Sequence, residues 1–256
     1  MERTQSFIFS SANATTVSAN RDEFSVTLDN PITIPSHARG VHVGVYNARV
    51  WNSVPNIVTG VNDLLYLTAS PDPQKILTIP QGLYGVSPLN TTIGNLLQNE
   101  GYDSDLITIR GDSATQKVYI IFKNTDISLD FTQAQTIGNL LGFDTVITSA
   151  SAGEIIFAPV IARFNQVNSF LISCSDLVHN GIPTNNSSAS ILVEVPITAG
   201  ANSQINYNPN NVLWIQSDHL ISKSLQHLSF RITNERLESL VINEDWSVLV
   251  SVKFIM

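Results

Sequence analysis

The sequence predicts a mainly β protein, a β-sandwich interrupted by one small α+β domain. Apolar and polar residues alternate with period two along most of the chain, which is the pattern of half-buried strands. Helical spacing of apolar residues appears only within residues 81–149. The chain also ends on an alternating strand, in which Val248, Val250, Val252 and Phe254 share one face. A C-terminus used in this way is typical of a closed sandwich.

The first eighty residues read as strands separated by turns. Phe7–Phe9 predicts a short first strand or arm, and residues 11–20 form a small, polar loop. Further strands are predicted within residues 23–35, 40–51, 62–70 and 74–80, with a turn at Asn30-Pro31.

The pattern changes after residue 80. Leu89, Ile93, Leu96 and Leu97 fall on one helical face, which predicts a helix from about residue 87. We expect Ser87 as its N-cap, Pro88 at its first position and Gly101 just past its end.

A hairpin follows the helix, in which Ile107 and Ile109 are expected to face Val118, Ile120 and Phe122. A strand in 125–131 and a second short helix in 132–143 come next. The hexapeptide TIGNLL occurs at Thr92–Leu97 and again at Thr136–Leu141. This repeat is explained either by a duplicated helix-plus-strand unit or by two short amphipathic helices that are similar by chance.

After residue 149 the β pattern returns. Strands are predicted within residues 154–164, 168–178, 189–198, 211–217 and 228–232, before the closing strand. The longest polar connections are 178–190 and 198–211, which we interpret as surface loops. Nine or ten strands outside the α+β segment fit a single jelly-roll β-sandwich of eight strands with one or two extra. The predicted domains are therefore a base, 1–80 with 150–256, and an inserted α+β (knob) domain, 81–149.

The chain is poor in charge. Charged residues make up 13%, about half of the roughly 25% of average soluble domains, and Asn, Ser, Thr and Gln replace them. Interfaces are depleted in charge in the same way, so the composition favours a protein that buries surface against neighbours over a poorly charged monomer. The net charge of −8 argues against nucleic-acid binding, which needs a basic face.

Cysteine usage and the termini limit the function classes further. The single Cys174 allows no internal disulfide, and its apolar strand-like context predicts a buried structural thiol rather than a nucleophile. We expect no secretory signal peptide and no transmembrane segment, since no apolar run approaches 18 residues.

Catalytic motifs are missing from the sequence. It holds no GxSxG, HExxH, P-loop or GxGxxG motif, so no catalytic, cofactor or metal residues are assigned. His37 and His42 are the histidines closest in sequence, but a spacing of five across a loop and a strand start does not favour a shared metal. A hydrolase with two carboxylates from distant strands stays open, although nothing selects a pair.

Two other features invite a binding interpretation. Arg110-Gly111-Asp112 lies where the hairpin turn is expected, and an exposed RGD at a loop tip is what integrins bind. Ordinary turn chemistry explains the same residues. The tryptophans Trp51, Trp214 and Trp246 are spread over three predicted strands, which favours core packing over a sugar-stacking platform.

Several stretches, in order, resemble a known family. They are NPITIP, GVHVGVYNARVWNSVPNI, GLYGVSPLNTTIGNLL, TIGNLLGFD and the closing WSVLVSVKFIM, of which IGNLLGF at Ile137–Phe143 is the most specific. The chain resembles the penton (minor capsid, vertex) proteins of polinton-like viruses, virophages and adintoviruses. The resemblance implies a single jelly roll with a projecting inserted domain, assembled as a homopentamer at the fivefold vertices of an icosahedral dsDNA virus capsid. Double-jelly-roll major capsid proteins would be its partners, and no catalytic residue is carried over.

Two other classes compete with this structural role. One is a receptor- or carbohydrate-binding β-sandwich, such as a fibre or tail adhesin. The other is a hydrolase on a jelly-roll frame. Self-association of the purified chain separates the first two classes, because the penton interpretation requires a mass five times 28.0 kDa.

Overall fold

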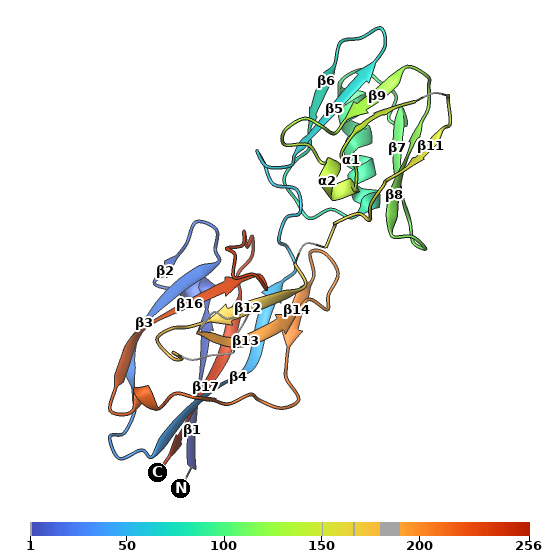
Figure 1. Cartoon of the computed structure of the whole chain (residues 1–256). Helices are drawn as coiled ribbons and strands as arrows, with labels where there is room; N and C mark the ends of the chain where they lie inside the picture. Colours follow the sequence, from blue (N-terminus) through green and yellow to red (C-terminus); the bar gives the residue numbers. More distant parts are fainter. Residues whose placement is uncertain (1, 150, 166, 180–189) are drawn as a thin grey trace. The chain divides into compact units, whose positions relative to one another are not determined.

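A computed structural model describes residues 2–149, 151–165, 167–179 and 190–256. The chain forms two compact units, each with its own hydrophobic core (Figure 1). We call Met1–Val54 with Val167–Met256 the base unit and Pro55–Gln166 the inserted unit. Most of the predicted loop 178–190 lies outside the described residues.

Two antiparallel sheets make up the base unit. The first has the order β1-β17-β4-β14, with β15 also paired to β4, and the second has the order β13-β12-β16-β3-β2. The strands of the first sheet are β1 (Glu2–Ser10), β17 (Ser247–Ile255), β4 (Gly40–Trp51), β14 (Gln204–Tyr207) and β15 (Ile215–Gln216). Those of the second are β13 (Ile191–Pro196), β12 (Ser169–Ser173), β16 (Ser224–Thr233), β3 (Glu23–Thr33) and β2 (Thr16–Val17). Short 3-10 helices lie at Ser11–Asn13 and Asp218–Leu220.

The order of these strands is that of a jelly roll. Without the two-residue strands β2 and β15, the described residues of the base unit form eight strands in chain order. The first, eighth, third and sixth form one sheet, and the second, seventh, fourth and fifth form the other. Apolar residues of both sheets, such as Val43, Val250, Phe170 and Phe230, belong to one buried cluster. The predicted fold class, mainly β with a jelly-roll sandwich, is confirmed.

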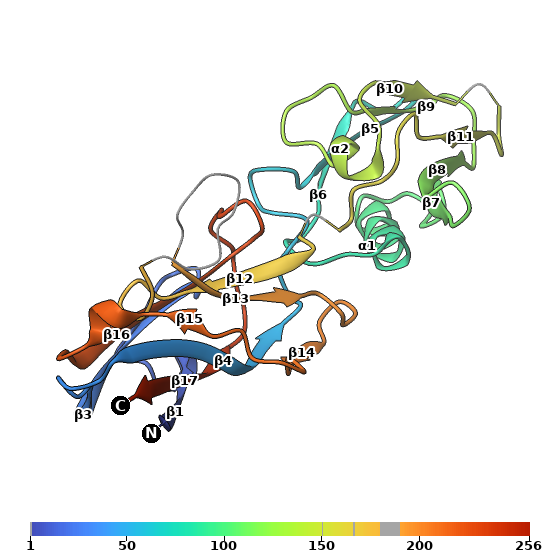
Figure 2. The ribbon, with the colours of Figure 1, turned by 60° about the horizontal axis from the view of Figure 1, so that its bottom comes forward.

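The C-terminal strand is central to the first sheet. β17 pairs with β1 from Glu2↔Ile255 to Ser10↔Ser247, and on its other side with β4 (Figure 2). The apolar face predicted for it, Val248 to Phe254, is buried. The first strand is longer than the predicted Phe7–Phe9, because β17 gives it a partner over its whole length.

The inserted unit is α+β. A four-stranded sheet has the order β10-β9-β5-β6 and a three-stranded sheet the order β11-β8-β7. The first consists of β10 (Val146–Thr148), β9 (Ile127–Asp130), β5 (Leu64–Ala69) and β6 (Lys75–Thr78), and the second of β11 (Ile155–Phe157), β8 (Lys117–Phe122) and β7 (Ile107–Asp112). The helices are α1 (Val86–Asn99) and α2 (Gly138–Leu141).

Helix α1 has the predicted buried face but a different start. Leu89, Ile93 and Leu97 are fully buried. The N-cap is Gly85 rather than Ser87, so Pro88 stands at the third helical position instead of the first. Pro88 still lies in the first turn, where backbone N–H groups have no acceptor within the helix. Gly101, with φ of 88°, follows the end of the helix as expected.

The inserted unit is larger than the predicted 81–149. Strands β5 and β6, assigned to the base from the sequence, pair with each other and with β9 of the inserted unit. The predicted strand 154–164 reduces to β11, which pairs with β8. Alternation of residue type shows that a strand buries one face, but it does not show which sheet the strand joins.

Candidate interaction surface

Strand β4 contains a β-bulge that reshapes one side of the sandwich. Leu249 pairs with Asn47 and Val250 with Val45, so Tyr46 is an extra residue in β4. The inward face consequently changes from Val41, Val43 and Val45 to Ala48 and Val50, all of which are buried. Tyr46 lies exposed on the outer face. A bulge of this kind bends the strand and interrupts regular pairing beside it.

The other side of β4 is shared by two short strands that leave a gap. β14 pairs with Ala48–Trp51, and β15 pairs with His42 and Val43. The segment 208–214 between them leaves the ladder and passes over Gly44. A Cβ at Gly44 would lie 2.6 Å from Cγ1 of Val212 and 3.2 Å from the Leu213 carbonyl oxygen, so a larger residue here would displace the segment. The side-chain amide of Asn47 donates to the Tyr207 carbonyl (3.1 Å) and to Oδ1 of Asn208 (2.8 Å), which fixes the start of the segment.

Trp214 anchors the end of this segment on the outer face of the sheet. Its ring meets that of Tyr46 edge-on, with centroids 6.0 Å apart. The ammonium group of Lys253 lies 5.3 Å from the Trp214 ring centroid, a cation–π contact. Trp246 is fully buried instead, against Phe24. Core packing thus explains Trp246, whereas Trp214 holds a surface segment.

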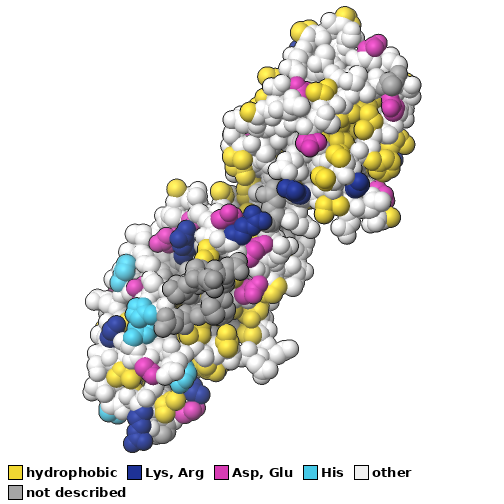
Figure 3. All heavy atoms as spheres, in the orientation of Figure 1, with side chains coloured by type: hydrophobic (Ala, Val, Ile, Leu, Met, Phe, Trp, Pro, Cys, Tyr) yellow, Lys and Arg dark blue, Asp and Glu magenta, His cyan; other side chains and the backbone are white. Residues whose placement is uncertain are grey.

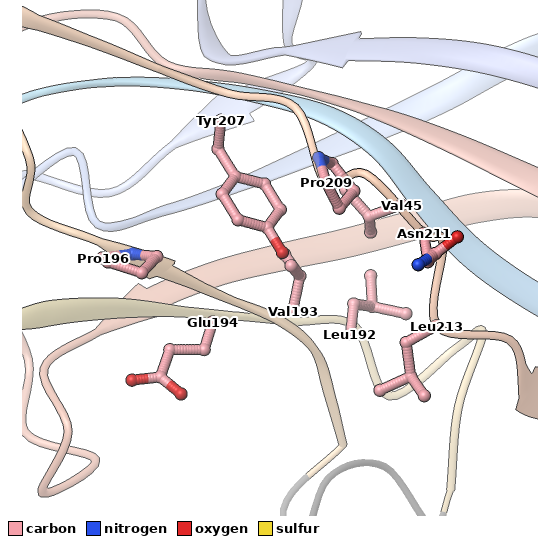
Figure 4. A pocket seen from close by; sticks show the side chains of 9 residues that line it. All are labelled: Val45, Leu192, Val193, Glu194, Pro196, Tyr207, Pro209, Asn211 and Leu213. Carbon is pink, nitrogen blue, oxygen red and sulfur yellow. The ribbon is translucent and has the colours of Figure 1, made fainter.

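A pocket of about 270 Å³ lies where the segment leaves the sheet (Figure 4). β13 forms one wall, and β14 with the segment that follows it forms the other. The apolar lining residues are Val45, Leu192, Val193, Pro196, Tyr207, Pro209 and Leu213, and the polar ones are Glu194 and Asn211. We call the side of the sandwich formed by β13, β14 and this pocket the pocket edge.

The chemistry of the pocket favours apolar contact. One carboxylate, one amide and one phenol are its polar side-chain groups, with no histidine, serine, cysteine or second carboxylate in the lining. The lining therefore offers no nucleophile beside a histidine or a second carboxylate, and Glu194 and Tyr207 are its groups able to exchange a proton. Leu213 is 60% exposed at the rim, although large apolar side chains are usually covered.

Sequence reasoning missed this surface. Residues 198–211 were expected to form a loop, yet they contain β14. In this strand only Ile205 is buried, so the sequence carries no alternation long enough to be recognised. The run NVLWIQS, predicted as a strand, provides only the two residues of β15 because its first half forms the segment over Gly44.

The RGD tripeptide lies in β7 and not in the turn of the hairpin. Arg110, Gly111 and Asp112 pair with Tyr119, Val118 and Lys117. The Asp112 carboxylate accepts hydrogen bonds from the Thr115 hydroxyl (2.7 Å) and the Ala114 N–H (3.0 Å). These bonds, that of Thr115 first, hold the pKa of Asp112 below its usual value. The Arg110 side chain is exposed. A receptor role for the tripeptide stays a prediction.

The remaining candidate residues are dispersed or buried. His37 lies in an exposed turn and His42 on β4. His179 and His219 have ring centroids 3.8 Å apart, and burial followed by the charge of His179 lowers the pKa of His219. In the part of the chain that the structure describes, no three His, Cys, Asp or Glu side chains gather in a metal-binding arrangement.

Cys174 is a buried thiol, as its sequence context predicts. Burial, and then the charge of Asp176, raise the pKa of Cys174 to about 12, so the thiol is protonated and unreactive at neutral pH. A search of the described residues for membrane-spanning helices finds none of sufficient length and apolar character.

The strand order and the surface define the class of the protein: a jelly-roll β-sandwich with a second compact unit inserted between β4 and β12. No protein-family model matches the chain, and no curated protein does. Among solved structures, the chain is similar to the crystal structure of the SeMet-labelled mavirus penton protein, with a TM-score of 0.46 and 9% sequence identity. The alignment covers 100% of this chain and 99% of that one. Mavirus is a virophage, and the sequence resemblance named the same class of protein.

Proposed function

We propose that this chain is a structural capsid protein, a homopentameric penton at the fivefold vertices of an icosahedral dsDNA virus-like capsid. Its location would be the virion, and double-jelly-roll major capsid proteins would be its neighbours. No enzymatic activity, cofactor or direct nucleic-acid contact belongs to this role. The base unit would make the contacts with neighbouring subunits, and the inserted unit would be the part that varies.

One observation carries the proposal: the jelly-roll base combines a mostly apolar pocket with exposed apolar side chains at its rim and on the edge strand β1. Ile8 is 75% exposed on β1, and Leu213 is exposed at the rim of the pocket. Exposed apolar groups on a low-charge surface are typical of interfaces between proteins. The mostly apolar lining of the pocket favours contact with an apolar group of a neighbouring protein.

Fivefold symmetry comes from the sequence resemblance, and mass measurement tests it directly. We expect light scattering on the purified chain to give five times 28.0 kDa, about 140 kDa. A clean monomer or trimer at high concentration would contradict the penton.

The inserted unit gives one observation in favour of the alternative, a receptor- or carbohydrate-binding protein. Ile155 and Phe157 are each 52% exposed on the outer face of the β11-β8-β7 sheet, and the Phe157 ring lies 5.2 Å from that of Tyr119. Hydrophobic side chains gather over β8 and β11 in Figure 3. Exposed aromatic rings of this kind bind sugars by stacking.

The two candidates are separated by two measurements. Glycan-array or cell binding by a chain that does not self-associate favours the adhesin, and a pentamer without such binding favours the penton. Replacing Phe157 by Ser tests the sugar-binding face, because its side chain is half exposed and its loss leaves the core intact. Ile76→Ser, at a similarly exposed position on β6, is the matched control.

A further inference from the structure

The pocket of the base unit requires an apolar occupant. Its volume of about 270 Å³ is just below the range of small-molecule sites, roughly 300–1,000 Å³. Leu192, Tyr207 and Leu213 give it apolar walls, and Glu194 is its one charged group. Such a site accommodates one or two aliphatic side chains better than a polar ligand, whose groups would find few partners.

Exposed apolar side chains lie on the side of the sandwich opposite this pocket. Within the described part of the base unit, the large exposed hydrophobic residues are Ile8, Val17, Tyr46 and Leu213. Leu213 lines the pocket, and Tyr46 packs on Trp214 next to it. Ile8 and Val17 lie on β1 and β2, the edge strands opposite β14 and β13 in their sheets. Ile8 alternates with the core-facing Phe7 and Phe9, so its side chain stands on the outer face of the first sheet at this edge. We call the side formed by β1 and β2 the β1 edge.

Strand β1 leaves backbone N–H and C=O groups unpaired along the β1 edge. The N–H of Ser11 donates to the carbonyl of Trp246, so by alternation Phe9 and Phe7 are the residues bonded to β17. The N–H and C=O groups of Ser6, Ile8 and Ser10 therefore point away from β17. No described strand pairs with β1 on that side.

The two edges differ in how they are protected. Residues 4–10 of β1 hold no charge and no proline, the usual protections of a sheet edge. On the pocket edge, β13 carries Glu194 and Pro196, which hinder addition of a strand. The pocket edge is thus suited to receive a side chain, and the β1 edge is suited to make contact along its length.

We propose that Ile8 of one copy occupies the pocket of the next copy, so that each subunit completes its neighbour's pocket. The inference rests on the pentamer proposed above and names its contact. Two different surfaces on opposite edges give a head-to-tail contact, which closes into a ring of five when the rotation between successive copies is a fifth of a turn, whereas a twofold dimer uses the same patch twice.

Strand β1 supplies part of the area that such a contact needs. Its nine residues extend over about 30 Å, and the two sheets of a sandwich lie about 10 Å apart. This strip of about 300 Å² is less than half of the roughly 800 Å² that each partner buries in a standard interface, so the contact must extend beyond β1 onto neighbouring surface. Residues 4–10 of β1 are uncharged and so add no repulsion between copies that each carry a net charge of −8.

Ile8→Arg tests the role of the Ile8 side chain in the full-length chain. Because Ile8 is largely exposed, we expect unchanged thermal unfolding of the monomer and at least an about tenfold higher concentration for pentamer assembly, as for loss of a central interface residue. Val61→Arg, at an exposed apolar position of the inserted unit, is the matched control and should assemble like the wild type.

A mixing experiment tests the head-to-tail geometry. Leu213→Arg should block the pocket and also prevent assembly. In a mixture of the two variants, Leu213→Arg keeps Ile8 intact and Ile8→Arg keeps the pocket intact. Light scattering should therefore show a heterodimer of two times 28.0 kDa, about 56 kDa. At the same concentration, below that at which either variant assembles, each variant alone should remain monomeric.

The outcomes distinguish the inference from the proposed function. A pentameric wild type together with a pentameric Ile8→Arg variant overturns the inference and leaves the penton in place. A mixture that stays monomeric overturns the head-to-tail contact. A monomeric wild type contradicts the pentamer itself, and the inference with it.

Discussion

At the scale of single residues, two close approaches of the chain depend on the absence of a side chain. Gly44 allows the segment 208–214 to cross β4, which opens the pocket. Gly138, in α2, lies against Phe131 and Phe143, so that a Cβ there would be 2.7 Å from both the Phe131 Cβ and the Phe143 carbonyl oxygen. At Gly138 one of the obstructing atoms is a backbone oxygen, which cannot move aside as the end of a side chain can, so this position requires glycine. At Gly44 the nearest atom belongs to the side chain of Val212, so a larger residue would displace the segment 208–214.

Gly138→Ala should destabilise the inserted unit by about 1–3 kcal/mol, the usual cost of overpacking a core. Thermal or urea unfolding of the full-length chain measures the change. Gly111→Ala is the matched control in the same unit, because its Cβ would meet Val86 at an ordinary 3.5 Å. Equal stability of the two variants would show that the chain relaxes around Gly138.

Asp112 illustrates a residue whose local role competes with a binding role. Its carboxylate is used by the turn that follows β7. We therefore expect Asp112→Glu, tested as immobilised protein in a cell-attachment assay, to attach cells as well as the wild type does. Loss of attachment with unchanged thermal unfolding would instead establish Arg110-Gly111-Asp112 as a receptor motif.

At the scale of elements, one hexapeptide serves two helices of different length. TIGNLL lies inside the fourteen-residue α1 and around the four-residue α2. In both copies the isoleucine, the glycine and the last leucine are buried. In both copies these three positions therefore form the face by which the helix packs against the core, although the two helices differ in length.

Strand β17 supports the first sheet from its centre. Truncation after Glu244 removes the partner of both β1 and β4, together with the buried Trp246. We expect the truncated chain to lose cooperative unfolding of the base unit, measured by near-UV circular dichroism and limited proteolysis. A soluble, cooperatively folding truncated base would contradict the role of β17 in the sandwich.

At the scale of the whole molecule, the two cores are separate. The buried cluster of the inserted unit draws on residues from Ile57 to Ala158, and that of the base unit draws on the remaining chain on both sides. A unit that contains its whole core can fold without the other.

The fragment 55–166 should therefore unfold cooperatively by itself in urea. The shorter fragment 81–149, the domain that the sequence predicts, is the matched comparison. It lacks β5, β6 and β11, so β8 and β9 each lose a partner strand and we expect it not to fold. Cooperative unfolding of 81–149 would restore the narrower domain.

Local chemistry was sufficient to predict much of the fold. Alternation in β17 and the spacing of Leu89, Ile93 and Leu97 give the buried faces directly, because burial requires apolar residues at the period of the element. Gly101 marks the helix end because it accepts a positive φ. The low charge of the sequence is typical of a protein that buries surface against neighbours.

Only the tertiary structure decided which strands meet. The sequence does not show that β5 and β6 join β9, that Gln204–Tyr207 extends the first sheet, or that Tyr46 is an extra residue in β4. Each depends on backbone hydrogen bonds between segments far apart in the chain, and these bonds are alike for every residue type. The pocket and the exposed Ile8 at opposite edges follow from that pairing, because strand order alone places them there.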